Sequence, residues 1–155
     1  LCANVSLNCL MNVHCLQKVV ADEPGLASVP QLDFSRQQNF GSLSLLDTEN
    51  GEKVDQITLD SLYLTRCDFI KIDVEGAEKL VLEGLENTIE KFHPKIFCEI
   101  YKGTNSNPDP EGTINFLIEA GYKAFVFIDG KLKEYESHND KNHDYLFIYS
   151  PGTIQ

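Results

Sequence analysis

The chain has 155 residues, a formal net charge of −11 and a pI near 4.7. This length is enough for one domain with a buried core. Its 13 Lys and Arg residues are scattered, which argues against a nucleic-acid partner, because phosphate backbones require clustered basic side chains. No apolar stretch approaches the roughly 20 residues that cross a membrane, and the start lacks the pattern of a secretory signal. We therefore predict one domain over residues 1–155, with neither a nucleic-acid partner nor a membrane span.

The first third of the chain has weak periodicity. The pattern predicts a helix over residues 1–12 and then a strand over 13–20 that ends at the turn 21–25, which contains Pro and Gly. Asn50-Gly51 is a typical hairpin turn. Residues 42–46 and 52–57 are therefore predicted to pair as a β-hairpin, with a surface loop as the alternative.

From residue 58 onward the pattern is much clearer. Apolar residues recur at helical spacing across 77–92, and His93-Pro94 ends that helix because the residue before proline avoids the α region. The remaining predicted elements are a short helix at 58–62, strands at 68–74, 95–101, 123–128 and 145–149, and a helix at 111–120. This order predicts an α/β fold with parallel strands joined by right-handed crossovers, in which the last two strands pair antiparallel.

The five cysteines are odd in number and contain no Cys-x-x-Cys pair. Cys98 lies inside an apolar strand, where a free thiol behaves as a small hydrophobic group. These features favour structural thiols over a disulfide or zinc role, and they predict a reducing compartment, the cytoplasm.

Charged residues gather where the strand 68–74 runs into the following helix. Ligands of parallel α/β sheets bind at the carboxyl ends of the strands, so charges there indicate chemistry. Side chains alternate along a strand, which places Lys71 and Asp73 on one face and Glu99 of the next strand on the same side. Charges within strands are costly to bury unpaired. We therefore predict a Lys71–Glu99 ion pair that positions Asp73; the alternative is two charges at exposed strand ends.

Further residues near this junction have two interpretations. Glu75 and Glu78 fall in the first helical turn, where the helix dipole favours acids, so helix capping competes with a functional role for Glu75 and is favoured for Glu78. Gly76 is predicted to allow a tight turn or a close approach to a ligand. Asp73 is the best candidate base or hydroxyl anchor, and His143 is a weaker candidate base. A cation site with oxygen ligands would need further clustered carboxylates, so no metal is predicted.

The block from Lys71 to Glu78, followed by Leu82-Glu83-Gly84, closely resembles the central motif of FkbM-type S-adenosylmethionine-dependent methyltransferases. Weaker similarity covers residues 4–13, 20–25, 39–45, 58–62, 94–100 and 121–122. The resemblance implies a Rossmann-like class I methyltransferase sheet, mostly parallel with an antiparallel last strand. It also implies S-adenosyl-L-methionine as cofactor and a small-molecule, sugar or lipid hydroxyl as methyl acceptor.

Two sets of site residues are expected on this basis. The expected catalytic residues are Asp73, Glu75, Lys71 and Glu99. The expected cofactor-binding residues are Asp22, Ala21, Asp73 and Gly76, with the segment that contains Ala21 and Asp22 beside the adenine ring.

The glycine-rich turn of the family has no counterpart, since no Gly-x-Gly occurs in the 155 residues. The resemblance therefore implies an N-terminally truncated domain that lacks the first two strands and half of the cofactor site. Unpaired sheet edges would leave such a fragment marginally stable, with weak binding of S-adenosylmethionine or none. The alternative function is a non-catalytic α/β interaction module that no longer binds cofactor.

Overall fold

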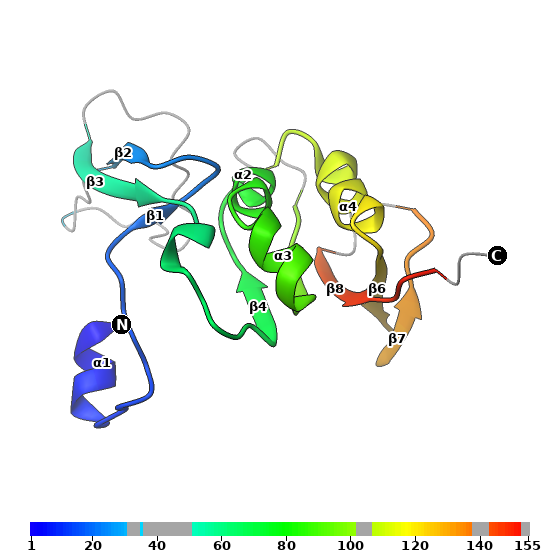
Figure 1. The fold of residues 1–155 in the computed structure, drawn as a ribbon, viewed down its shortest axis with the longest axis horizontal. Helices are drawn as coiled ribbons and strands as arrows, with labels where there is room; N and C mark the ends of the chain where they lie inside the picture. The colour runs from blue at the N-terminus through cyan, green and yellow to red at the C-terminus, as the bar shows by residue number, and fades with distance from the viewer. Residues whose placement is uncertain (31–34, 36–50, 102–106, 138–142, 153–155) are drawn as a thin grey trace.

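The computed structural model describes residues 1–30, 35, 51–101, 107–137 and 143–152 (Figure 1). The helices are α1 (Cys2–Leu7), α2 (Glu78–Glu83), α3 (Glu86–Phe92) and α4 (Pro110–Glu119), with a 3-10 turn η1 (Asp60–Leu62). The strands are β1 (Val19–Val20), β2 (Gly25–Val29), β3 (Glu52–Ile57), β4 (Phe69–Ile72), β5 (Lys95–Glu99), β6 (Tyr122–Ile128), β7 (Lys131–Glu134) and β8 (Asp144–Tyr149). The fold is mixed α/β, as predicted from the sequence. None of the described helices has both the length and the apolar character needed to cross a membrane.

The smaller sheet has the strand order β1-β3-β2 and lies beside the larger one (Figure 1). Its central strand β3 pairs parallel with β1 and antiparallel with β2. The segment 42–46, predicted as the hairpin partner of β3, lies outside the described residues. The predicted helix 1–12 is shorter, and of the predicted strand 13–20 only the last two residues form β1. No residue of α1 is buried, so no tertiary packing supports a longer helix.

The larger sheet has the order β4-β5-β8-β6-β7. β4 and β5 pair parallel, and β8 inserts between β5 and β6 and runs antiparallel to both. The predicted antiparallel last strand is therefore confirmed. β4, β5 and β6 therefore run in the same direction, and β8 is the antiparallel strand inserted between β5 and β6. The hairpin strand β7, which pairs antiparallel with β6, was not predicted.

The predicted helix 77–92 is divided into α2 and α3. Gly84 ends α2, and a Cβ atom at this position would lie 2.0 Å from the carbonyl oxygen of Ala21. Because Gly84 has no side chain, the backbone after β1 can contact the backbone at the end of α2. This contact connects the smaller sheet to the helices that cover the larger one.

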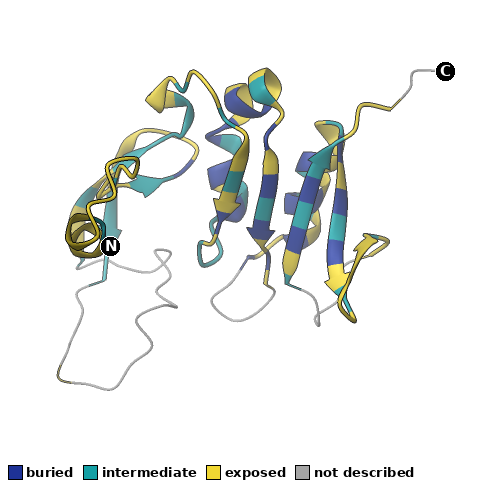
Figure 2. Ribbon diagram, turned by 90° about the horizontal axis from the view of Figure 1, so that it is seen from below, coloured by how far each residue is buried: buried dark blue, intermediate teal, exposed yellow. Residues whose placement is uncertain are grey.

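Helices α2, α3 and α4 lie on one face of the larger sheet (Figures 1 and 2). The core forms between them and the sheet, where Leu82, Ile96, Ile114 and Phe147 are fully buried. Alternate strand residues face the other way and are more exposed, as the alternating burial in Figure 2 shows. Lys71 belongs to this second, less covered face, because it alternates with Ile70 and Ile72 along β4.

Candidate active site

A cavity of about 300 Å³ opens where β4 and β5 end and β8 begins. Its lining residues are Asp73, Val74, Glu75, Gly76, Glu78, Glu99, Tyr101 and His143. Of the four residues expected to be catalytic, three line this cavity, and the fourth, Lys71, contacts one of them. The cavity therefore lies where ligands of parallel strands bind, at the strands' carboxyl ends.

Lys71 forms an ion pair with Asp73 rather than with Glu99. The predicted Lys71–Glu99 pair was wrong because of the strand register. The register places Lys71 opposite Phe97, so that Glu99 lies two residues further along, level with Asp73. The Lys71 and Asp73 side chains are 54 % and 53 % exposed, so solvent screens their attraction and the pair orients Asp73 more than it stabilises the fold.

The Asp73 and Glu99 carboxyl groups affect each other's pKa. The hydrogen bond from Lys71 holds the pKa of Asp73 below its ordinary value, although burial opposes this effect. Burial raises the pKa of Glu99, and the negative charges of Asp73 and Asp144 raise it further. As pH falls, Glu99 therefore takes up a proton before Asp73 and can donate a hydrogen bond to it. Such a pair titrates as one unit.

The loop between β4 and α2 supplies the other wall of the cavity. Gly76 has φ 86°, a left-handed conformation that glycine adopts without strain, so the predicted tight turn is present. Its N–H donates a hydrogen bond to Oε1 of Glu78 at 3.0 Å. Glu78 is only 2 % exposed, and its Oε2 has no hydrogen-bond partner among the described residues. Burial raises the pKa of Glu78. Glu78 thus supports the loop, as the capping interpretation implies, but it also lines the cavity.

Two aromatic residues complete the cavity. The Ile100 N–H donates to the carbonyl oxygen of His143 at 2.7 Å and holds the segment before β8 against the end of β5. The Tyr101 and His143 rings meet edge to face, with centroids 4.5 Å apart. Nδ1 of His143 is buried without a described partner. His143 was only a weak candidate from sequence, and Tyr101 was missed; its one signal is its place directly after a strand.

The expected cofactor-binding residues do not all meet. Asp73 and Gly76 line the cavity, whereas Ala21 and Asp22 follow β1 and do not line it. Ala21 is buried, and its N–H donates to the Ile57 carbonyl oxygen at 3.0 Å. Asp22 is exposed. The structure thus divides this set between the ends of β1 and β4.

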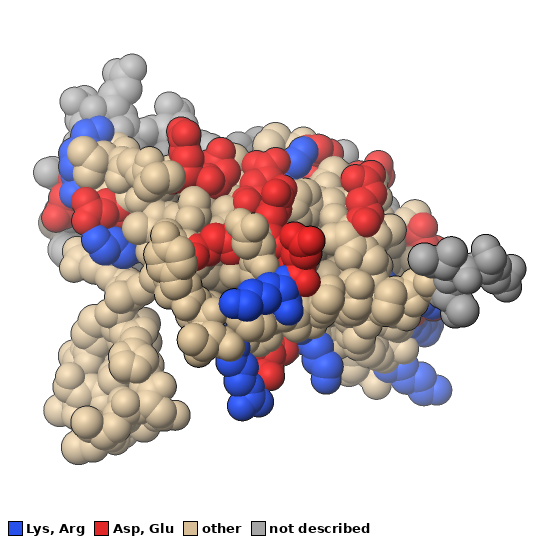
Figure 3. All heavy atoms as spheres, in the orientation of Figure 1, with Lys and Arg blue, Asp and Glu red and all other residues tan. Residues whose placement is uncertain are grey.

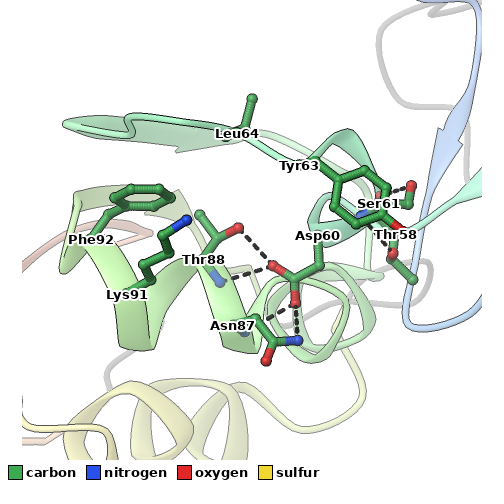
Figure 4. Close-up of a pocket in the computed structure, with 9 residues that line it drawn as sticks. All are labelled: Thr58, Asp60, Ser61, Tyr63, Leu64, Asn87, Thr88, Lys91 and Phe92. Carbon is green, nitrogen blue, oxygen red and sulfur yellow. Dashed lines mark hydrogen bonds between the residues drawn. The ribbon is translucent and has the colours of Figure 1, made fainter.

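A second cavity, of about 400 Å³, lies between η1 and α3 (Figure 4). Its one carboxylate, Asp60, accepts hydrogen bonds from Asn87 and Thr88, both from their backbone N–H groups and from their side chains. These residues form the first turn of α3, whose own N-cap Leu85 has no side-chain acceptor. Asp60 therefore caps α3 from a distance. Its hydrogen-bonding capacity is taken up by this structural role, which makes the first cavity the better candidate site.

The surface charge agrees with the acidic composition. On the face shown in Figure 3, Asp and Glu side chains gather over the helices, and Lys and Arg lie along the lower edge, at the left over the smaller sheet and singly among the acidic side chains. Within the part of the chain that the structure describes, no group of three or more His, Cys, Asp or Glu side chains is arranged to hold a metal ion.

Comparison with protein families gives one match. The model of the methyltransferase FkbM domain matches residues 3–124, which include β4, β5 and the loop that carries Asp73 to Glu78. Comparison with curated proteins and with solved structures gave no match. Since the family model covers well over half of the chain, the protein belongs to the FkbM methyltransferase family.

Proposed function

We propose that the protein transfers a methyl group from S-adenosylmethionine to a hydroxyl group of a small molecule, sugar or lipid. The observation that carries this proposal is the carboxylate pair Asp73–Glu99 at the end of β4, beside a cavity large enough for part of an acceptor. The family assignment supports the methyltransferase chemistry, and the pair supports a hydroxyl as acceptor, because a hydroxyl must lose its proton.

The Lys71 ion pair gives Asp73 its role in this proposal. Because the pKa of Asp73 is lowered, its carboxylate is ionised at neutral pH and accepts a hydrogen bond from the acceptor hydroxyl. This contact orients the hydroxyl oxygen toward the methyl donor, and alignment is the main requirement of an in-line displacement. The hydroxyl proton passes to the Asp73–Glu99 pair, which is the base in the transfer.

S-adenosylmethionine, when bound, supplies the methyl group as part of a sulfonium cation. The residues that would hold it are Asp22 and Ala21 at the end of β1 and Gly76 at the end of β4. Gly76 fits this role because its left-handed backbone and missing side chain allow a ligand to approach closely. Asp22 fits it because its carboxylate is exposed and free to accept hydrogen bonds from a ligand.

The test is methyl transfer by the full-length protein, measured as S-adenosylhomocysteine formation with a panel of hydroxylated acceptors. Asp73→Asn keeps the shape of the side chain but removes its charge and basicity. We expect kcat to fall by roughly 100-fold or more, as for loss of a general base. The matched control is Asp68→Asn, at the opposite end of β4, where Asp68 forms an exposed ion pair with Arg66. Equal turnover by Asp73→Asn and wild type would refute the role of Asp73.

A further inference from the structure

We propose that the cavity at the ends of β4 and β5 binds an organic cation, so that the methyl acceptor carries an ammonium group near the hydroxyl that is methylated. This inference rests on the proposed function and names the substrate class for the same site.

The first observation is the unsatisfied carboxylate oxygen of Glu78. This residue is 2 % exposed and lines the cavity. Its carboxylate interacts with the N–H groups of Gly76 and Glu78 and with the Asn107 side chain, but its Oε2 has no described hydrogen-bond partner. The nearby Asn107 side chain donates to Oγ1 of Thr113 at 2.8 Å. A buried carboxylate oxygen without a donor is costly, and an ammonium group can supply the missing hydrogen bond.

The second observation is the charge around this oxygen. Four carboxylates line the cavity, from Asp73, Glu75, Glu78 and Glu99. Among the described residues that line the cavity there is no Lys or Arg, and the ammonium group of Lys71, next to it, is held by Asp73. Like charges that share one site repel each other. A bound cation relieves this repulsion, whereas a carboxylate or phosphate group would add to it.

The third observation is the aromatic wall. Tyr101 is 48 % exposed and lines the cavity together with its edge-to-face partner His143. A tyrosine ring attracts an organic cation through its face and packs against the methylene groups next to the charge. Carboxylates and an aromatic ring that line the same cavity suit an alkylammonium group better than a neutral alcohol.

The position of the cavity favours the acceptor over the methyl donor. Of the three residues proposed to hold the donor, Ala21 and Asp22 do not line this cavity and only Gly76 does. The carboxylate pair that receives the hydroxyl proton does line it. An ammonium group bound by Glu78 therefore belongs to the molecule whose hydroxyl lies at Asp73.

The test uses three probes of similar size with the full-length protein: ethanolamine, ethylene glycol and glycolate. The reporter is the Gly76 amide in two-dimensional ¹H–¹⁵N NMR, because this N–H bonds to Glu78. We expect ethanolamine to shift this signal with an affinity at least about tenfold higher than the other two probes, as for a charge-assisted hydrogen bond. Equal affinities, or no response to ethanolamine, would overturn the inference.

Variants separate this site from general attraction of cations. Glu78→Gln should weaken ethanolamine binding at least about tenfold, whereas Glu83→Gln, on the same helix but outside the cavity, should not change it. If Glu78→Gln does not fold, Glu75→Gln replaces it and should weaken binding in the same direction. Unchanged binding in the folded cavity variant would overturn the inference, and so would the same shift with magnesium chloride at equal concentration.

Addition of S-adenosylmethionine distinguishes the two ligands. Ethanolamine that stays bound supports an acceptor site, and displacement of ethanolamine would assign the cavity to the donor and overturn the inference. Ethanolamine binding without any methyl transfer would refute the proposed function but would still support the cation site. Methylation of neutral hydroxyl compounds without ethanolamine binding would support the proposed function but overturn the inference.

Discussion

Replacement of Asp60 by alanine removes the remote cap of α3. Asp60 accepts hydrogen bonds from the backbone N–H groups of Asn87 and Thr88 at 3.0 and 2.8 Å and from their side chains at 2.9 and 2.6 Å. Loss of a cap costs about 0.5–2 kcal/mol, and a buried donor left without a partner costs about 1–3 kcal/mol more. Because Thr88 is only 5 % exposed, we expect Asp60→Ala to lower the free energy of unfolding by about 2–4 kcal/mol at pH 7.

This loss should depend on pH in a defined direction. Burial alone would raise the pKa of Asp60, but the hydrogen bonds from Thr88 and Asn87 outweigh it and lower the pKa. A carboxyl group with a lowered pKa stabilises the folded state above its unfolded pKa of about 3.9, and this stabilisation is lost as pH falls through the folded value. The difference between wild type and Asp60→Ala should therefore narrow below about pH 4.

The assay for this prediction is urea unfolding followed by circular dichroism at pH 7 and at pH 3. The control is Asp68→Ala, which removes an exposed ion pair with Arg66 and should change the free energy of unfolding by less than about 0.5 kcal/mol. A loss in Asp60→Ala no larger than in the control, or a loss that does not change with pH, would refute the capping role.

Two further predictions concern packing. Gly84→Ala places a Cβ atom against the Ala21 carbonyl oxygen and should destabilise the protein by about 1–3 kcal/mol in the same urea assay. Gly25→Ala, where a Cβ atom meets nothing within 4 Å, should stay within about 0.5 kcal/mol of wild type. Equal stability of the two variants would contradict the close approach. Burial raises the pKa of the Cys98 thiol, which is 0 % exposed, so iodoacetamide should modify it at least about tenfold more slowly than the exposed Cys2 in the native protein. Similar rates by peptide mass spectrometry would contradict this burial.

The sequence predicted the elements whose apolar residues follow a regular period. β4, β5, β6 and α4 were placed within a few residues, because each buries one face against the same core. β7 was missed because all four of its residues are exposed and show no apolar alternation. The break at Gly84 was missed because the apolar spacing continues through it, and only the contact with Ala21 reveals it.

The site was predicted in part for a similar reason. Strand alternation placed Asp73 and Glu99 on the same face of neighbouring strands, but it did not predict that these two carboxyl groups interact. The partner of Lys71 depended on the register between β4 and β5, which alternation does not fix. Tyr101 and His143 meet only because β8 pairs with β5, a contact between segments about 40 residues apart in the chain that no local pattern contains.

The most direct test of the central claim is calorimetric titration of S-adenosylmethionine into the full-length protein, with the Asp73→Asn variant alongside. The account predicts that wild type binds the donor and that the variant retains this binding while it loses turnover, because Asp73 orients the acceptor hydroxyl. The opposite result is expected of an α/β interaction module without cofactor. No binding by the full-length wild-type protein would contradict the methyltransferase account and support that module.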